Sequence, residues 1–267
     1  MEGLTGKVGI VTGAASGIGR ATAQKLARSG VSVVVSDINL TGAEETVQLI
    51  TEAGGTAVAQ RTDVRNEDEL AAMVEKAIDT YGALHLLHSN AAHVELVEEE
   101  TTVENTEAAL WDLTFEVNAR SVLLGAKYAI PHMVEAGGGA IVNTSSATAG
   151  FGEPHTRTAY AASKGAINQL TRTIATQYGK QGIRANAVAP GAVRTPNFND
   201  GVSEEVLEVW RRNHLTPELG KPENVADTVA FLLSDLAAFI TGQVLYVDGG
   251  LTVHTPLYSE MLLGREA

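Results

Sequence analysis

Short apolar runs rich in β-branched residues alternate along this chain with longer stretches whose apolar residues recur at helical spacing. The run from Val31 to Ser36 is almost continuously apolar, which is typical of a strand buried on both faces of a parallel sheet. Strands are predicted at residues 7–12, 31–36, 56–60, 84–88, 140–144, 184–189 and 243–247. Helices are predicted at residues 17–29, 41–53, 66–81, 105–134, 158–178 and 222–234. Because strands alternate with helices, we expect βαβ units and an α/β fold with a parallel sheet.

The chain has no linker, repeat or low-complexity tract that would divide it, so residues 1–267 are expected to form one domain. Its least regular part is residues 194–220, which contain Pro196, Pro217 and a short amphipathic stretch at 203–212. A long excursion in a compact domain is often a lid over a binding site. The alternative is an ordinary surface connection.

Composition narrows the class of protein. With 267 residues, of which 44% are hydrophobic and 19% charged, the chain can build a full globular core. It has no cysteine, which excludes disulfides, thiolate metal sites and cysteine nucleophiles. Its net charge of -13 argues against binding to nucleic acids or to anionic membrane surfaces. It has neither an apolar run long enough to span a bilayer nor a secretory signal, so a cytoplasmic protein is expected.

A glycine-rich turn, Thr12-Gly13-Ala14-Ala15-Ser16-Gly17-Ile18-Gly19, joins the first predicted strand to the first helix. Glycines at such a turn let the backbone approach a pyrophosphate, and the helix start supplies N–H groups and a positive dipole. Glycine clusters also serve ordinary turns, but the position between strand and helix favours dinucleotide binding. Cofactor contacts are predicted from Gly13, Ser16, Gly17, Ile18 and Gly19.

Asp37 ends the second predicted strand, where an acidic residue can bind the adenosine ribose of NAD and repel a 2′-phosphate. Its neighbours Ser36 and Ile38 supply no positive charge for NADP, so NAD is predicted and NADP is the weaker alternative. A strand-end cap is the other interpretation of Asp37.

Tyr160 and Lys164 lie four residues apart in a predicted helix and therefore on the same helix face. An ammonium near a phenol favours the phenolate, so it lowers the phenol's pKa from its usual value of ~10. Such a tyrosine can exchange protons near neutral pH. On spacing alone the two residues could equally be an unremarkable surface pair.

Several short motifs occur together in one order along the chain. They are Thr12–Gly19, Asp63-Val64, Asn90-Ala91-Ala92, Asn118, Ser145-Ser146, Tyr160–Lys164, Pro190-Gly191 with Thr195, and Val247-Asp248-Gly249-Gly250. In these motifs the chain resembles the short-chain dehydrogenase/reductase family over nearly its whole length. The resemblance implies a single Rossmann-type, doubly wound domain with a seven-stranded parallel sheet flanked by helices.

The resemblance also implies residue roles. Tyr160 is the expected general acid/base, Lys164 binds the nicotinamide ribose and tunes Tyr160, and Ser146 binds the substrate oxygen. Asn118 is expected to kink its helix and hold a water on the proton path. The implied cofactor contacts beyond the glycine turn are Asp37, Ile38, Asp63, Val64, Asn90, Ala91, Ala92, Tyr160, Lys164, Pro190, Gly191, Val193 and Thr195. No metal ligands are predicted.

The sequence departs from the family pattern near two of these motifs. Ala92 stands where the family has glycine, and Ser146 precedes Tyr160 by fourteen residues, one more than usual. The longer spacing leaves Ser145 as an alternative to Ser146. Asp63 could instead cap the following helix, and Val247–Gly250 could be only a strand end with a turn.

The predicted function is NAD-dependent interconversion of a secondary alcohol and a ketone by hydride transfer. The alternatives are a 3-oxoacyl carrier-protein reductase using NADPH and a non-catalytic nucleotide-sensing protein on the same fold. The expected substrate pocket is formed by residues 92–95, 147–155 and 195–215. It would offer the apolar side chains Phe151, Phe198, Leu207 and Trp210 and the polar options His93, His155 and Arg157. This favours a small, mostly apolar alcohol or ketone, with a cyclic alcohol, a diol, a steroid and a polyol as alternatives. By analogy with related enzymes, a homotetramer or homodimer is expected.

Overall fold

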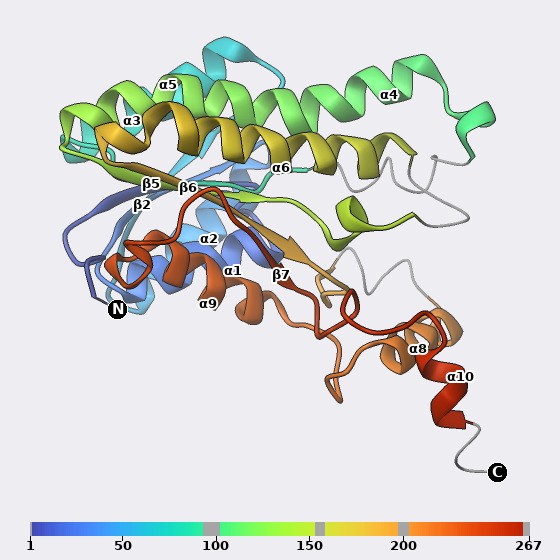
Figure 1. Ribbon diagram of the computed structural model, residues 1–267. Coiled ribbons are helices and arrows are strands. Elements are labelled where there is room, and N and C mark those ends of the chain that lie inside the picture. Colours follow the sequence, from blue (N-terminus) through green and yellow to red (C-terminus); the bar gives the residue numbers. More distant parts are fainter. Residues whose placement is uncertain (1, 93–101, 153–157, 197–202, 264–267) are drawn as a thin grey trace.

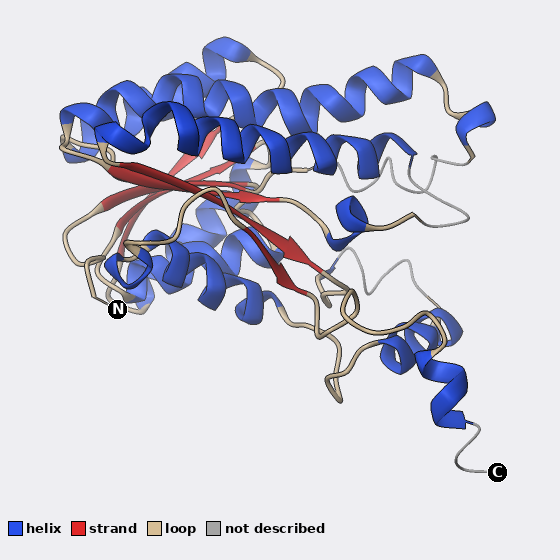
Figure 2. Cartoon of the chain, viewed as in Figure 1, coloured by secondary structure: helices blue, strands red, loops and turns tan. Residues whose placement is uncertain are grey.

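The computed structural model describes residues 2–92, 102–152, 158–196 and 203–263. Within them, seven parallel strands form one sheet with the order β3-β2-β1-β4-β5-β6-β7 (Figure 2). The strands are β1 Val8–Thr12, β2 Ser32–Asp37, β3 Thr56–Arg61, β4 Leu86–Ser89, β5 Gly139–Thr144, β6 Ile183–Pro190 and β7 Val244–Val247. The α/β fold with a seven-stranded parallel sheet is therefore confirmed.

Helices cover both faces of this sheet (Figure 1). They are α1 Gly17–Arg28, α2 Leu40–Glu52, α3 Glu67–Tyr81, α4 Ala108–Phe115, α5 Ser121–Glu135, α6 Thr158–Tyr178, α8 Glu204–Asn213, α9 Pro222–Leu233 and α10 Tyr258–Leu263. Helices α1, α2 and α9 lie on one face, and α3, α5 and α6 lie on the other. Among the described residues, no helix is long and apolar enough to cross a membrane.

The two hydrophobic cores follow from the alternation of side chains along each strand. On β2, Val33 and Val35 point into the core shared with α1, α2 and α9, whereas Val34 points into the core shared with α3, α5 and α6. All three side chains are fully buried. Burial on both faces is the reason that this strand needed an unbroken apolar run rather than an alternating one.

The helix predicted over residues 105–134, with a kink expected at Asn118, is divided in the structure. A short 3₁₀ turn at Val103–Asn105 precedes α4, and a π-helical turn at Glu116–Arg120 separates α4 from α5. π-Helical structure is rare and occurs mostly as a single turn inside an α-helix. This turn contains Asn118, the residue at which the family resemblance implies a kink.

The C-terminal part extends beyond the sheet, where α8 and the unpredicted α10 lie side by side (Figure 1). The segment around α8 has a small core of its own, formed by Ala192, Leu207 and Leu219, against which Trp210 packs. It is also tied to the strand-β7 exit, since Leu215 N donates to Gly249 O at 2.7 Å. The irregular region near residues 203–220 is thus a packed segment with its own small core, separate from the two main cores.

Candidate active site

The strand order reverses direction between β1 and β4, and ligands of open α/β sheets bind at the carboxyl ends of strands near such a point. Two predicted cofactor motifs meet there. Asn90, which follows β4, donates through Nδ2 to Thr12 O at 3.2 Å and to Gly13 O at 3.3 Å. Thr12 Oγ1 in turn accepts from Asn90 N and Ala91 N.

The glycine turn requires glycine for steric reasons. Gly13 has a φ of 64°, and a Cβ there would lie 2.9 Å from Ala91 Cα. A Cβ on Gly19 would lie 2.0 Å from Gly13 O, and Gly17 has a φ of 51°. No larger residue fits this packing without moving backbone, so the turn is held in one close-packed shape.

Helix α1 begins at this turn without a side-chain cap: Ser16, its N-cap residue, makes no capping hydrogen bond in the described structure. In contrast, α2, α3 and α8 are capped by the side chains of Asn39, Asn66 and Ser203. The first N–H groups of α1 are thus suited to an anionic ligand.

Asp37 lies at the end of β2 with its carboxylate anchored to the glycine turn. Its Oδ2 accepts from Ala15 N and its Oδ1 accepts from Asn39 N, both at 2.9 Å. Ile38 follows with a 55% exposed side chain. The nearby guanidinium of Arg20 is directed to α2, where it bonds Thr46 Oγ1 and Glu45. The carboxylate therefore dominates the charge at the expected ribose position.

Asp63, two residues beyond the end of β3, is held by a neighbouring arginine. Its carboxylate forms an ion pair with Arg65, and this pairing lowers the pKa of Asp63. The cap of α3 is Asn66 rather than Asp63. Val64 is partly buried beside the core under α3. Contacts of Asp63 and Val64 with adenine stay predictions.

Tyr160 and Lys164 lie on one face of α6, with Lys164 Nζ 5.5 Å from the centroid of the Tyr160 ring. The lysine is 2% exposed, and its Nζ donates to Thr144 O at 2.8 Å. Burial penalises the charged ammonium and lowers the pKa of Lys164 to about 8. Lys164 is therefore buried and Tyr160 only partly exposed, which excludes the interpretation of two surface residues.

Asn118 sits in the π turn and is fully buried. Its Nδ2 donates to Ser163 Oγ at 3.0 Å, and Ser163 Oγ donates to Tyr160 O at 2.7 Å. Asn118 Oδ1 has no hydrogen-bond partner among the described residues. A buried acceptor of this kind is suited to hold a water molecule.

The two serines after β5 have different environments. Ser145 Oγ donates to Lys164 O at 3.1 Å, so it fixes the backbone of α6. Ser146 Oγ accepts from Thr148 Oγ1 at 2.9 Å and caps the short 3₁₀ turn Ala147–Gly150. The hydroxyl proton of Ser146 is left for another acceptor, which supports Ser146 over Ser145 as the residue that binds substrate oxygen.

The loop after β6 lies against the glycine turn. A Cβ added to Gly17 would lie 3.2 Å from Thr195 Cγ2. Gly191 packs on Asp248, since a Cβ there would lie 2.8 Å from Asp248 Cα, and Val193 pairs with Gly220 in an isolated bridge. Together with Pro190, the last residue of β6, these positions border the same edge of the sheet as Lys164.

Some expected substrate contacts cannot be placed. His93, His155, Arg157 and Phe198 lie outside the described residues. Among the residues the structure does place, Phe151 is half-buried after the 3₁₀ turn, and Trp210 packs on the small core of the α8 segment. Sequence reasoning assigned no role to two polar residues near the site, His88 and Thr144, which lie in the last two residues of their strands.

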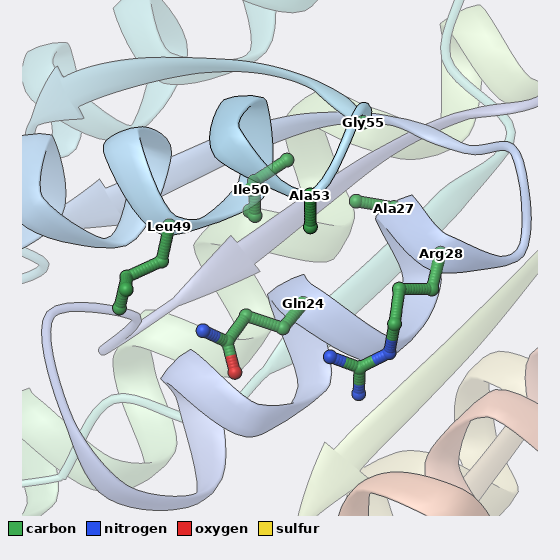
Figure 3. A pocket seen from close by; sticks show the side chains of 7 residues that line it. All are labelled: Gln24, Ala27, Arg28, Leu49, Ile50, Ala53 and Gly55. Atoms are coloured by element: carbon green, nitrogen blue, oxygen red, sulfur yellow. The ribbon is translucent and has the colours of Figure 1, made fainter.

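A surface crevice between α1 and α2 is unrelated to this site (Figure 3). Its lining residues are Gln24, Ala27, Arg28, Leu49, Ile50, Ala53 and Gly55. They lie where α1 and α2 end, which is the opposite edge of the sheet from the carboxyl ends of the strands.

Within the described part of the chain, no three His, Asp or Glu side chains are grouped so as to hold a metal ion.

Comparisons with known proteins agree with this architecture. A family model described as enoyl-(acyl carrier protein) reductase matches residues 13–252. A probable short-chain type dehydrogenase/reductase of Bradyrhizobium diazoefficiens is 44% identical over 260 residues, 97% of this chain and 92% of that protein. The cyclohexanol dehydrogenase of Acinetobacter sp. (strain SE19) is 42% identical over 246 residues, 92% of this chain and 95% of that protein.

The solved structures include a similar protein, a 7α-hydroxysteroid dehydrogenase complexed with NADH and 7-oxo glycochenodeoxycholic acid. It superposes with a TM-score of 0.88 at 34% sequence identity and covers 92% of this chain and 94% of that one. Given these matches over nearly the full length, together with the strand order and the arrangement around Tyr160 and Lys164, the chain belongs to the short-chain dehydrogenase/reductase family.

Proposed function

We propose that this chain is an NAD-dependent oxidoreductase that interconverts a ring-borne secondary alcohol and the corresponding ketone. The observation that carries the proposal is the buried ammonium of Lys164 beside the Tyr160 ring, at the sheet edge where the glycine turn and Asp37 lie. A charge is costly to bury, so its presence beside a phenol favours a chemical role.

The residues at the sheet edge fit a dinucleotide. The uncapped start of α1 would bind the pyrophosphate, and the anchored carboxylate of Asp37 would accept hydrogen bonds from the adenosine ribose. A 2′-phosphate would meet that carboxylate at close range, which favours NAD over NADP. When bound, NAD⁺ supplies the hydride acceptor for the oxidation of the alcohol.

Side chains of this protein would accept the proton and bind the substrate oxygen. Tyr160, as phenolate, takes the hydroxyl proton of the alcohol, and Ser146 hydrogen-bonds the same oxygen. The ammonium of Lys164 stabilises the phenolate electrostatically. A water bound near Asn118 Oδ1 would connect this interior to solvent, because that acceptor is buried and otherwise without a partner among the described residues.

The substrate class follows from the relatives of this chain. The similar proteins include a cyclohexanol dehydrogenase and a 7α-hydroxysteroid dehydrogenase complexed with 7-oxo glycochenodeoxycholic acid. Both names point to an alcohol carried on an alicyclic ring, so a ring-borne alcohol is favoured over a linear alcohol or a polyol. In the segment proposed to cover the site, Leu207 and Trp210 pack into that segment's own small core.

A carrier-protein reductase is the competing enzyme class, because the matching family model bears that description. Such enzymes take an acidic carrier and normally use NADP, whereas this chain has Asp37 at the ribose position and a net charge of -13. A non-catalytic sensor has no need of a buried Lys164 or of Asn118.

Purified protein incubated with a panel of alcohols tests the proposal, with NAD⁺ and NADP⁺ run side by side and reduced cofactor followed by its absorbance. The panel contains cyclohexanol, a hydroxysteroid, a linear secondary alcohol and a polyol. Turnover of a cyclic alcohol with NAD⁺ is the expected result. A separate reaction with NADPH and a 3-oxoacyl thioester tests the alternative enzyme: oxidation of NADPH there, without turnover of any alcohol, would support the carrier-protein reductase instead. NAD binding without any turnover would support the sensor.

We also infer that the active species is a homo-oligomer, with a tetramer favoured over a dimer. Helices α4 and α5 expose apolar side chains that a single chain leaves uncovered, including Trp111 at 37% and Leu123 at 51%. The edge strand β7 likewise exposes Leu245 at 42% and Tyr246 at 39%. Two separate apolar surfaces support two kinds of subunit contact.

A further inference from the structure

A histidine lies fully buried on β4, directly behind the cofactor edge of the sheet. The Nε2 of His88 is 2.9 Å from Thr144 Oγ1 on the neighbouring strand β5. Thr144 Oγ1 is also 3.3 Å from Asn90 Oδ1. A polar side chain in an otherwise apolar interior is costly unless it is hydrogen-bonded, so this contact requires an explanation.

The hydrogen bonds in this group can run in only one direction. Asn90 Nδ2 faces two carbonyl oxygens, Thr12 O and Gly13 O, so it must be the amide nitrogen, and Oδ1 must face Thr144. The single proton of the Thr144 hydroxyl then goes to Asn90 Oδ1. Thr144 Oγ1 must therefore accept from His88, which requires the proton on Nε2.

Thr144 also connects this chain of hydrogen bonds to the reacting groups. Its backbone carbonyl is the acceptor for Lys164 Nζ at 2.8 Å. Thr144 thus makes two connections. Its side chain reaches the glycine turn through Asn90, and its backbone carbonyl binds the buried ammonium of Lys164. Burial lowers the pKa of His88 to about 3, so the ring is neutral at physiological pH and carries the one N–H that the arrangement needs.

We propose that His88 is a positioning residue whose Nε2–H holds Thr144, and through it Asn90 and the glycine turn, in the arrangement that binds NAD beside Lys164. This inference rests on the proposed NAD site. His88 does not touch the reacting atoms; it acts through Thr144. The competing interpretation is that His88 only fills space between β4 and the helices of the α1 face.

Two pairs of variants separate these interpretations. His88→Leu removes the donor and keeps much of the volume, whereas His88→Gln places an amide N–H near the position of Nε2. Thr144→Val removes the hydroxyl and keeps the carbonyl that binds Lys164, whereas Thr144→Ser keeps both. Leu86→Val, two residues earlier on β4 and equally buried, is the control for a change in packing alone.

The measurement is the dissociation constant of NADH, followed by the fluorescence of the bound nucleotide, with folding of each variant checked by circular dichroism. We expect His88→Leu and Thr144→Val each to weaken binding about tenfold, a loss typical of one buried hydrogen bond. His88→Gln, Thr144→Ser and Leu86→Val should stay within about threefold of the wild type. The double variant His88→Leu/Thr144→Val should be no weaker than the worse single variant, because both remove the same bond.

The inference is overturned if folded His88→Leu and Thr144→Val bind NADH as tightly as the wild type, or if His88→Gln loses as much affinity as His88→Leu. If His88→Leu does not fold, the Thr144 pair decides the question alone. A wild-type protein that binds no NADH would contradict the proposed function itself, a result distinct from any difference among variants.

Discussion

At the scale of single residues, the site depends on two charged side chains. One is buried at a cost in free energy, and the other is proposed to select between NAD and NADP. Lys164 is an ammonium with almost no exposed surface, and Asp37 is a carboxylate fixed by two backbone N–H groups. The first tunes a neighbouring phenol, and the second selects a ribose without a phosphate. A single substitution tests each role: Lys164→Met through the pH dependence of stability, and Asp37→Ala through the preference for NAD⁺ over NADP⁺.

Replacing Lys164 should change how stability depends on pH. In the unfolded chain its pKa is 10.5, but in the fold it is about 8, so the unfolded state binds more protons between these values. The free energy of unfolding of the wild type should therefore rise as pH increases from about 8 towards 10.5, by up to about 3 kcal/mol. Below pH 8 the cost of burying the charge is fully present.

Urea unfolding at pH 7.5 and pH 9.5, without cofactor, measures this effect. Lys164→Met should lack the wild type's gain at the higher pH, whereas Lys180→Met, at an exposed lysine, should keep it. An identical pH dependence in the wild type and Lys164→Met would show that the ammonium is not buried as described.

Replacing Asp37 should shift the choice of cofactor. Asp37→Ala removes the carboxylate that repels a 2′-phosphate, so the ratio of kcat/KM for NAD⁺ to that for NADP⁺ should fall at least tenfold. The loss of hydrogen bonds to a charged group, worth ~1.5–3 kcal/mol, accounts for this size. Glu44→Ala, which removes an exposed carboxylate of α2 and leaves both Asp37 and the Arg20–Glu45 ion pair in place, is the matched control and should keep the ratio of the wild type. An unchanged ratio in Asp37→Ala would remove Asp37 from the ribose site.

At the scale of elements, the segment around α8 is attached to the rest of the fold by a few identifiable contacts. His254 Nε2 lies 2.7 Å from Asn213 O at the end of α8, and Leu215 N donates to Gly249 O. Gly249 has a φ of 59°, and a Cβ there would lie 2.6 Å from Thr216 Oγ1. The position of the proposed lid therefore depends on close packing at this glycine.

Gly249→Ala should displace residues 214–216 and raise the KM for the alcohol about tenfold, with the KM for NAD⁺ within twofold of the wild type. Gly54→Ala is the control: it has a φ of 80° as well but nothing within 4 Å of the added carbon, so it carries the backbone strain alone. Steady-state kinetics with one substrate varied at a time gives both constants. Equal effects of the two substitutions on the alcohol KM would argue against a lid in this segment.

The sequence predicted most elements because their causes are local. Each strand was expected within two residues of where it lies. The central strands β1 and β4 are buried throughout, and such strands require an apolar run. The apolar spacing of residues 105–134 did not show where that stretch divides, whereas the family resemblance implied a kink at Asn118, which lies in the π turn Glu116–Arg120. Helix α10 was missed because six residues are too few to show helical spacing.

The site was predictable to the same extent. Tyr160, Lys164, Asn118 and Ser146 were found from motifs, and the structure brings the first three together through Ser163 and the ring contact. His88 and its partner Thr144 could not be found from spacing, because they are 56 residues apart and meet only when β4 pairs with β5.

At the scale of the whole molecule, the proposal to be tested is the number of chains in the oligomer. If the α4–α5 surface and the β7 surface both form subunit contacts, the protein should sediment with about four times the 28.0 kDa mass of one chain. Leu123→Glu places a charge at an exposed apolar position of α5 and should reduce this mass by half or more. Leu49→Glu, at a similarly exposed leucine of α2, should leave it unchanged. A monomeric wild type in analytical ultracentrifugation would contradict the proposed oligomer.

The most direct measurement of the central proposal is the activity of Tyr160→Phe with NAD⁺ and a cyclic alcohol, alongside its affinity for NADH. Tyr178→Phe, at the far end of α6, is the control. The proposal predicts that Tyr160→Phe binds NADH within about threefold of the wild type while kcat falls ~10²–10⁴-fold, the usual effect of losing a general acid/base. A kcat within tenfold of the wild type would contradict the assignment of Tyr160 as the residue that takes the proton.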